Sequence, residues 1–165
     1  MVCEDQELVQ LDRKLDEVYT AAKDKTTPAQ SVDLRANQRG WIKGRDECWK
    51  AVDPRLCVAT EYRLRITELE AQYRLLEGIG PIQYRCAGNY DQPLRVRFYE
   101  TDPLSAWAEF GTDSAILYRQ AAGSGAKYEG RNISLWEYHG EAVLVWGYRA
   151  PHLHCIVEQS KNRSE

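Results

Sequence analysis

The hydrophobic pattern changes its period once along this chain, and this change constrains the fold more than any other feature. Residues 4–77 place apolar side chains three and four positions apart, the spacing of an amphipathic helix. Beyond Gly78-Ile79-Gly80-Pro81, short runs alternate apolar and polar residues, as strands do. Glycine ends helices and proline prevents their continuation. The sequence therefore predicts a helical domain over residues 1–77, a linker over 78–81 and a β domain over 82–165.

The helical domain divides into three segments. The first helix is expected to end near Lys25. Thr27-Pro28 then supplies an N-cap followed by proline at the first helical position, which begins a second helix. Asp53-Pro54 breaks that helix, and a third apolar stripe runs from Arg55. We therefore expect a small three-helix unit.

The β domain contains six runs of strand character separated by clusters of Gly, Asp, Asn and Pro. They recur at intervals of about 8–12 residues, which favours a small antiparallel barrel or sandwich. We expect Phe98, Trp107 and Trp146 to fill its interior. The predicted strands are Gln83–Cys86, Leu94–Tyr99, Ala115–Arg119, Ile133–Trp136, Ala142–Trp146 and His154–Val157.

Composition excludes some functions. The 165 residues carry a formal net charge of −3, and no basic face indicates a nucleic-acid partner. No run of 18 apolar residues predicts a membrane span. Because no charged and apolar signal segment precedes Cys3, we interpret Met1 as a start placed downstream of a removed targeting segment.

A motif in the second half resembles a known family. Ser124-Gly125-Ala126-Lys127-Tyr128 is followed by Leu135-Trp136 and by Gly140-Glu141-Ala142-Val143-Leu144. This order resembles the S-G-x-x-Y, [FL]-W, A-x-L signature of the MliC/PliC inhibitors of C-type lysozyme. Tyr84-Arg85-Cys86 and Cys155 extend the resemblance over about the last 85 residues.

The resemblance implies an eight-stranded barrel, and so an α+β protein of two domains. It implies inhibition of C-type lysozyme in the bacterial periplasm or at the outer membrane, with no catalytic activity and no cofactor. In the family a Ser of this loop and a Lys two residues after the Trp reach into the lysozyme cleft. Ser124 matches the first, whereas Tyr138 and then His139 follow Trp136-Glu137 here. The expected lysozyme-binding residues are Ser124, Gly125, Lys127, Tyr128, Tyr138 and His139.

The residue types suit that role. A serine hydroxyl both donates and accepts, so it can bond a protonated or an ionised carboxyl group. Lys127 could supply a cation, and Tyr138 offers a hydroxyl and a flat apolar ring. Tyr128 and Trp136 are expected to serve mainly as core or bracing residues.

The run from Gln38 to Cys48 resembles the Q-R-x-W-x-x-x-R-D-x-C core of the LprI-like N-terminal domain of bacterial envelope proteins. The resemblance covers about residues 3–76 and implies a fold, while the partner of the helical domain stays unknown. Arg45 lies on the same helix face as Trp41. We expect it to pair with Asp12 or Asp16 inside the unit, and a binding site at this face is the alternative.

The chain has five cysteines, a number that fits an oxidising compartment or a metal site. We expect two disulfides, Cys48–Cys57 and Cys86–Cys155, the second tying the first strand of the barrel to the last. Cys3 is then left over. It either pairs with a cysteine upstream or is a lipidated N-terminal cysteine, which would tether the protein to a membrane.

Other functions fit the sequence less well. Ser124 and His139 lack the G-x-S-x-G context of a hydrolase nucleophile. His152 and His154 share a strand face, but no third metal ligand is evident, and we expect no metal site. The main alternative is an envelope module that binds a ligand inside the barrel, or acts as an adaptor, without inhibiting lysozyme.

Overall fold

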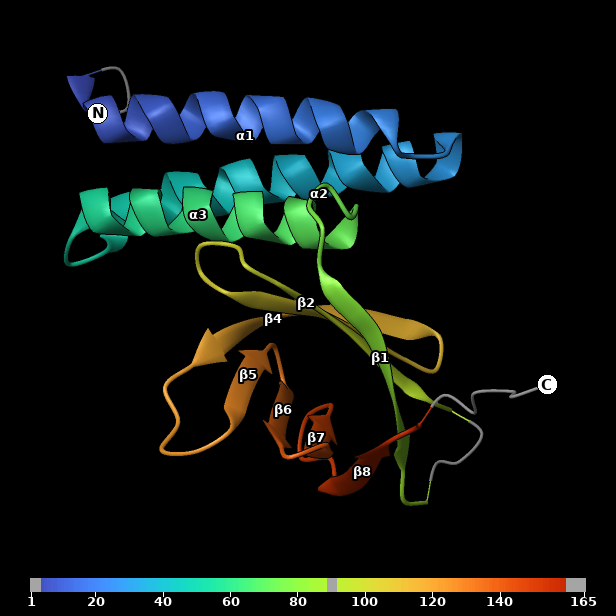
Figure 1. Ribbon diagram of the computed structural model, residues 1–165. Coiled ribbons are helices and arrows are strands. Elements are labelled where there is room, and N and C mark those ends of the chain that lie inside the picture. Colours follow the sequence, from blue (N-terminus) through green and yellow to red (C-terminus); the bar gives the residue numbers. More distant parts are fainter. Residues whose placement is uncertain (1–3, 89–91, 160–165) are drawn as a thin grey trace. The chain divides into compact units, whose positions relative to one another are not determined.

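The computed structural model describes residues 4–88 and 92–159 and separates into two compact units (Figure 1). The helical unit ends at Leu76 and the barrel unit begins at Glu77. The predicted α+β fold, three helices followed by a closed antiparallel barrel of eight strands, is confirmed in these described residues. The helical elements are α1 (Gln6–Asp24), α2 (Pro28–Asp46), the 3₁₀ turn η2 (Glu47–Lys50) and α3 (Pro54–Gln72).

Each helix begins at a local signal in the sequence. The Asp5 carboxylate accepts hydrogen bonds from the backbone N–H groups of Glu7 and Leu8, which caps α1. Thr27 caps α2 in a reciprocal capping box with Gln30. Asp53 caps α3, so Pro54 is the first residue of that helix rather than part of a break before it.

The core of the helical unit is built around α3, which packs against both α1 and α2. The three helices contribute aliphatic side chains and the ring of Tyr62, and the Cys48–Cys57 disulfide links η2 to the first turn of α3. The buried members are Leu8, Leu15, Val18, Ala22, Leu34, Cys48, Val58, Ala59, Tyr62, Ile66 and Leu69.

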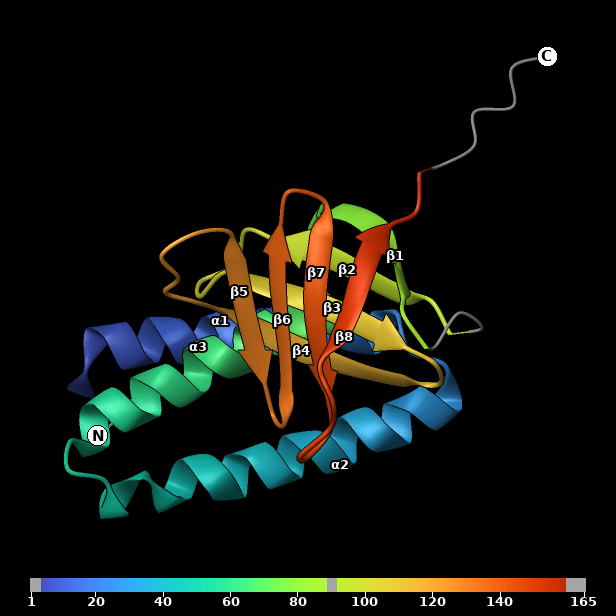
Figure 2. The ribbon, with the colours of Figure 1, turned by 90° about the horizontal axis from the view of Figure 1, so that it is seen from below.

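The barrel is a simple meander in which each strand pairs with the next and β8 returns to β1 (Figures 1 and 2). Figure 2 shows β5 to β8 side by side along one wall. The strands are β1 (Ile79–Cys86), β2 (Leu94–Tyr99), β3 (Ser105–Phe110), β4 (Asp113–Gln120), β5 (Ala126–Gly130), β6 (Ile133–Tyr138), β7 (Glu141–Trp146) and β8 (Leu153–Val157).

Two of these strands, β3 and β5, were not among the six predicted runs. In β3 two of the inward positions carry only alanine, Ala106 and Ala108, and in β5 Tyr128 is the only large apolar residue. Small or sparse apolar side chains leave little alternation to detect. Pairing with their neighbours is what makes these segments strands.

The predicted linker over 78–81 was too long. β1 begins at Ile79, which pairs with Phe98 of β2, and the register shifts between Ile79 and Ile82. Gly80 lies in this irregularity with a φ of 109°, a conformation that glycine adopts without strain. The glycines and proline that suggested a linker instead lie at the start of β1, where the strand register is irregular.

Side chains fill the interior of the barrel. Buried side chains from all eight strands form one cluster, and Phe98 and Trp146 pack against it as predicted. Trp107 was predicted to lie inside but alternates with Ala106 and Ala108, so it points to the outer face. The buried members are Tyr84, Cys86, Leu94, Val96, Ala106, Ala108, Leu117, Tyr128, Leu135, Ala142, Leu144 and Cys155.

The Cys86–Cys155 disulfide lies at the seam where β8 meets β1. The two residues are direct cross-strand partners and are almost fully buried. Among the described helices, none is long and apolar enough to cross a membrane.

The seam disulfide is expected to stabilise the protein more than the helical one. Cys86 and Cys155 are 69 residues apart and Cys48 and Cys57 only 9. Chain entropy gives about 4 kcal/mol for the longer loop and about 3 kcal/mol for the shorter. Replacing Cys86 and Cys155 with Ala should lower the free energy of unfolding more than the matched change at Cys48 and Cys57. Denaturant titration of both double variants measures this, and the reverse order would contradict it.

Candidate functional site

The motif predicted as one loop is divided between a loop and a strand. Residues 121–125 connect β4 to β5, so Ser124 and Gly125 lie in the loop, whereas Ala126, Lys127 and Tyr128 belong to β5. Ser124 is exposed, and its hydroxyl makes no hydrogen bond within the described part of the chain. The loop therefore presents a free hydroxyl group to solvent.

The backbone around Ser124 is held by side chains from neighbouring strands. The indole Nε1 of Trp136 on β6 donates to the carbonyl of Ser124 at 3.0 Å. A guanidinium nitrogen of Arg119 on β4 donates to the carbonyl of Gly125 at 3.4 Å. Because both bonds use backbone carbonyls, they orient the loop and leave the serine hydroxyl available.

Gly125 allows the loop to approach β6 closely. Its φ is +66°, in the left-handed region, and a Cβ added there would lie 2.4 Å from the carbonyl oxygen of Glu137. A Cβ on Gly123 would meet nothing within 4 Å, and its φ is ordinary. Only the second glycine is thus required by the geometry.

Lys127 and Tyr128 point to opposite sides of β5. The Lys127 ammonium forms an ion pair with Glu129 at 2.8 Å on the surface. Exposed ion pairs of this kind contribute little to stability, so the Lys127 ammonium could exchange Glu129 for a carboxylate of a binding partner. Tyr128 is 6% exposed and packs against Phe98 in the core, so in this conformation it cannot touch a partner directly.

Tyr138 and His139 form the end of the β6–β7 hairpin. Tyr138 is 49% exposed, and the His139 ring meets its ring edge-on at 4.2 Å between centroids. His139 and Gly140 both have positive φ, at 50° and 82°, the conformation of a tight hairpin turn. His139 thus occupies a backbone position that favours glycine.

A depression of about 300 Å³ adjoins Ser124 on the outer face of β6, β7 and β8. Trp136 pairs with Val143, which pairs with His154, and Tyr138 pairs with Glu141 in the neighbouring row. Trp136 is 46% exposed, so it contributes surface as well as the bond to Ser124. The lining residues are Ser124, Trp136, Tyr138, Glu141, Ala142, Val143 and His154.

Sequence reasoning did not assign Glu141, Val143 or His154 to this site. Alternation along β7 and β8 could have placed their side chains outward, but only the strand register brings them beside Trp136 and Tyr138. In the described residues, no group of three or more His, Cys, Asp or Glu side chains is placed to hold a metal ion.

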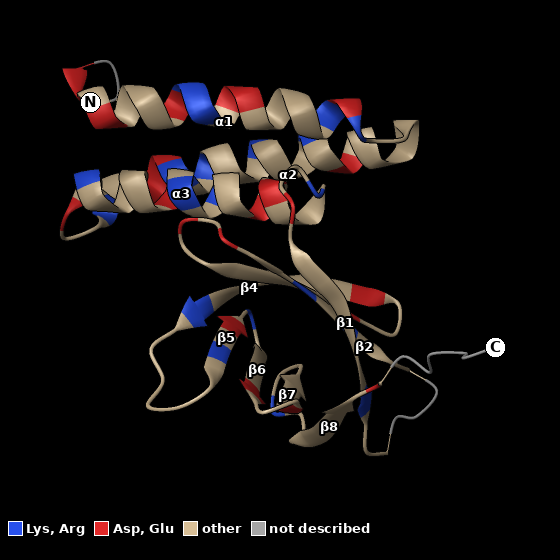
Figure 3. Ribbon diagram, in the orientation of Figure 1, with Lys and Arg blue, Asp and Glu red and all other residues tan. Residues whose placement is uncertain are grey.

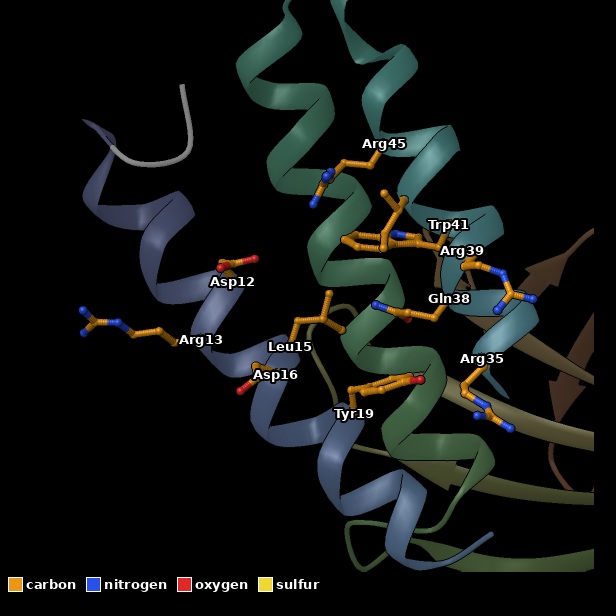
Figure 4. Close-up of a pocket in the computed structure, with 11 residues that line it drawn as sticks. Asp12, Arg13, Leu15, Asp16, Tyr19, Arg35, Gln38, Arg39, Trp41 and Arg45 are labelled. Atoms are coloured by element: carbon orange, nitrogen blue, oxygen red, sulfur yellow. The ribbon is translucent and has the colours of Figure 1, made fainter. Parts of the chain in front are cut away.

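The helical unit has a groove of about 480 Å³ between α1 and α2 (Figure 4). In Figure 4, Asp12 and Leu15 on α1 and Trp41 and Arg45 on α2 face α3, which runs between these helices. Arginines form much of the rim, and Figure 3 shows both signs of charge along α1 and α2. The lining residues are Asp12, Arg13, Leu15, Asp16, Tyr19, Arg35, Gln38, Arg39, Trp41, Ile42 and Arg45.

The sequence predicted that Arg45 pairs with Asp12 or Asp16, and this prediction was wrong for a direct contact. Its guanidinium binds the neighbouring Asp46 at 2.7 Å and donates to the hydroxyl of Tyr62 at 3.0 Å. That hydroxyl in turn donates to Asp12 at 2.8 Å. The tyrosine is long enough to bridge the helices, so the contact between Arg45 and Asp12 runs through its hydroxyl.

Most polar groups at the base of the groove are paired within the protein, although one terminal nitrogen of the buried Arg65 has no hydrogen-bond partner in the described residues. Burial and then the bond to Asp12 raise the pKa of Tyr62, so its hydroxyl stays protonated as the donor. Gln38 accepts a hydrogen bond from the buried Arg65 at 2.9 Å. Trp41 meets the ring of Tyr62 edge-on and lies under the Arg45 guanidinium. These contacts are those of a structural network.

Comparison with known families and proteins agrees with this two-unit organisation. A family model described as "Membrane-bound lysozyme-inhibitor of c-type lysozyme" (MliC) matches residues 84–152. A second, described as "Lysozyme inhibitor LprI", matches residues 1–69. Both units thus resemble families described as lysozyme inhibitors. No solved structure gives a significant match to the chain.

Curated relatives match across both units. Lipoprotein LprI from Mycobacterium tuberculosis strain H37Rv is 34% identical over 145 residues, which is 87% of this chain and 72% of the relative. The protein of the same name from Mycobacterium bovis matches to the same extent. The chain therefore belongs to the LprI family, with an LprI-type helical unit followed by an MliC-type barrel.

The two glycines of the β4–β5 loop provide a matched test of the site geometry. Gly125→Ala should lower the free energy of unfolding by about 1–3 kcal/mol, because it combines a left-handed φ with a collision against the Glu137 carbonyl. Gly123→Ala should have almost no effect, since its Cβ would enter open space. Denaturant titration of both variants measures the difference. Equal effects would mean that the loop does not hold this conformation.

Proposed function

We propose that this chain inhibits C-type lysozyme by inserting the β4–β5 loop, led by Ser124, into the catalytic cleft. The observation that carries the proposal is the exposed Ser124 hydroxyl on a loop whose carbonyls are held by Trp136 and Arg119. The two family descriptions, both of lysozyme inhibitors, support the class of target. A preorganised loop loses little conformational freedom on binding, which favours a tight complex.

The chemistry of the target suits a serine. C-type lysozyme works with two carboxyl groups in a cleft, one kept protonated as the acid and the other ionised. The Ser124 hydroxyl can accept from the first or donate to the second. In either state, the inhibitor would satisfy the groups that otherwise act on the substrate.

The outer face of β6 to β8 would extend the contact beyond the loop. Trp136 and Tyr138 offer exposed aromatic surface beside Ser124, and the depression there could receive a projecting side chain of the enzyme. The Lys127 ammonium could exchange Glu129 for the ionised carboxyl group of the cleft. We assign Gly125 and Tyr128 supporting roles, since one shapes the loop and the other is buried.

We place this protein in the bacterial envelope, in the periplasm or at the outer membrane. The curated relatives are named lipoproteins, and one family description reads "membrane-bound". A tether through an N-terminal segment would fit those names. Cys3, which could carry such a tether or pair with a cysteine upstream, lies outside the described residues.

The packing of the barrel favours an inhibitor over a carrier. A protein that holds a small ligand inside its barrel needs an internal cavity, whereas here the inward positions form one buried cluster. The exposed chemistry lies instead on the loop and on the outer face beside it.

Replacing Ser124 tests the proposed contact. Ser124→Ala should weaken inhibition of hen-type lysozyme by at least about tenfold, roughly the contribution of one hydrogen bond to a charged or strongly polar group. The readout is lysis of bacterial cell walls over a range of inhibitor concentrations, with the protein oxidised. Ser114→Ala, an exposed serine on β4 outside the loop, is the control and should inhibit like the parent chain. Undiminished inhibition by Ser124→Ala would remove this residue from the mechanism.

Restoring the lysine of the MliC/PliC pattern tests the second contact. Tyr138→Lys should strengthen inhibition by about tenfold, because an ammonium beside the loop can pair with the ionised carboxylate of the cleft. Tyr148→Lys adds the same charge at another exposed tyrosine and controls for overall charge. Inhibition constants for both variants give the comparison. A gain that is equal in both would show that position 138 has no specific role.

A further inference from the structure

The turn between α2 and α3 exposes three large apolar side chains. Trp49 is 70% exposed, Leu56 is 55% exposed and Val52 projects fully into solvent. They lie within eight residues of one another, around the Cys48–Cys57 disulfide, and we call them the apolar tip. Large apolar residues gathered at one protruding point commonly mark a contact surface.

The backbone of the tip is well fixed. The disulfide joins η2 to the first turn of α3, and the Asp53 carboxylate accepts a hydrogen bond from the Leu56 N–H at 2.9 Å. The Ala51 N–H also donates to the Cys48 carbonyl at 3.0 Å. The three apolar side chains are therefore exposed on an ordered turn.

The charged groups around the tip are largely neutralised by one another. Lys50 forms an ion pair with Glu47, and its ammonium also lies 5.2 Å from the centre of the Trp49 ring. Arg45 pairs with Asp46. Asp53 caps α3, so the charged groups here are engaged while Trp49, Val52 and Leu56 leave apolar surface exposed.

The tip lies at the same end of the helical unit as the start of α1 (Figures 1 and 2). Arg55, in the first turn of α3, pairs with Asp5 at 2.5 Å and with Glu7 at 2.6 Å. Arg63 also binds Glu7. A tether attached on the N-terminal side of α1 would therefore bring the tip to the membrane surface.

We propose that the apolar tip is a second membrane contact, in which Trp49, Val52 and Leu56 enter the interfacial layer of a lipid bilayer. Trp is favoured at that depth because its ring is apolar and its N–H is polar, and the Lys50 ammonium can stay among the headgroups. A single lipid chain holds a protein only weakly, and a second apolar contact strengthens the attachment. The inference rests on the envelope location proposed above and is independent of lysozyme inhibition.

The test uses the full chain without a lipid anchor and vesicles of phosphatidylethanolamine and phosphatidylglycerol in equal parts. We expect the chain to co-sediment with the vesicles and to remain bound in high salt, because the contact is apolar. The double variant Trp49→Ser/Val52→Ser should bind at least about tenfold more weakly. Val32→Ser removes an exposed valine from α2, away from the tip, and should bind like the parent.

Three results would overturn the proposal: no vesicle binding by the parent chain, equal binding by the double variant, or binding that high salt abolishes. Self-association without vesicles that the double variant loses would also overturn it, since the tip would then bind a second copy of the chain. Lysozyme inhibition, measured without lipid on the same variants, should not change. If neither the parent chain nor any variant inhibits lysozyme, the proposed function is refuted, while the result of the membrane test still stands.

Discussion

The barrel depends on closure at the seam between β1 and β8. There the chain joins residues separated by most of the β domain, and Cys86 and Cys155 are direct partners in the ladder and in the disulfide. Closure gives every strand two neighbours and defines an inside and an outside for each of them. The inside is packed with side chains, so the outer face and the loops are the surfaces left for recognition.

In the proposed mechanism, recognition depends on how the outer face of the barrel supports the β4–β5 loop. Trp136 shows this most clearly, because its ring is half exposed beside Ser124 while its N–H holds the Ser124 carbonyl. One side chain thus contributes both exposed aromatic surface and a contact that holds the loop. Gly125 permits the same close approach from the loop side, because no Cβ separates it from β6. A short loop without secondary structure of its own is held in one conformation in this way.

In the helical unit, the packing of the helices depends on polar side chains that contact one another between them. Tyr62 connects Arg45 on α2 to Asp12 on α1, and the buried Arg65 is bound to Gln38 and Glu68. Buried polar groups cost stability unless they are paired, and here the pairing fixes how α3 sits between its neighbours. Asp12, Gln38 and Arg45 of this network also line the groove between α1 and α2.

The sequence by itself determined the features that depend on neighbouring residues. The caps at Thr27 and Asp53 start helices through local hydrogen bonds, and the change of period separates helices from strands. The family signature marked Ser124 in the same way, as a short string of residues. Strands β3 and β5 escaped notice because their inward residues are small or few. The sequence also favoured a core role for Tyr128, which is buried. Only the tertiary structure decided that Trp107 points outward and that Val143 and His154 lie beside Trp136. The reason is that strand register and barrel closure set which distant residues become neighbours, and neither is written in any one stretch of the chain.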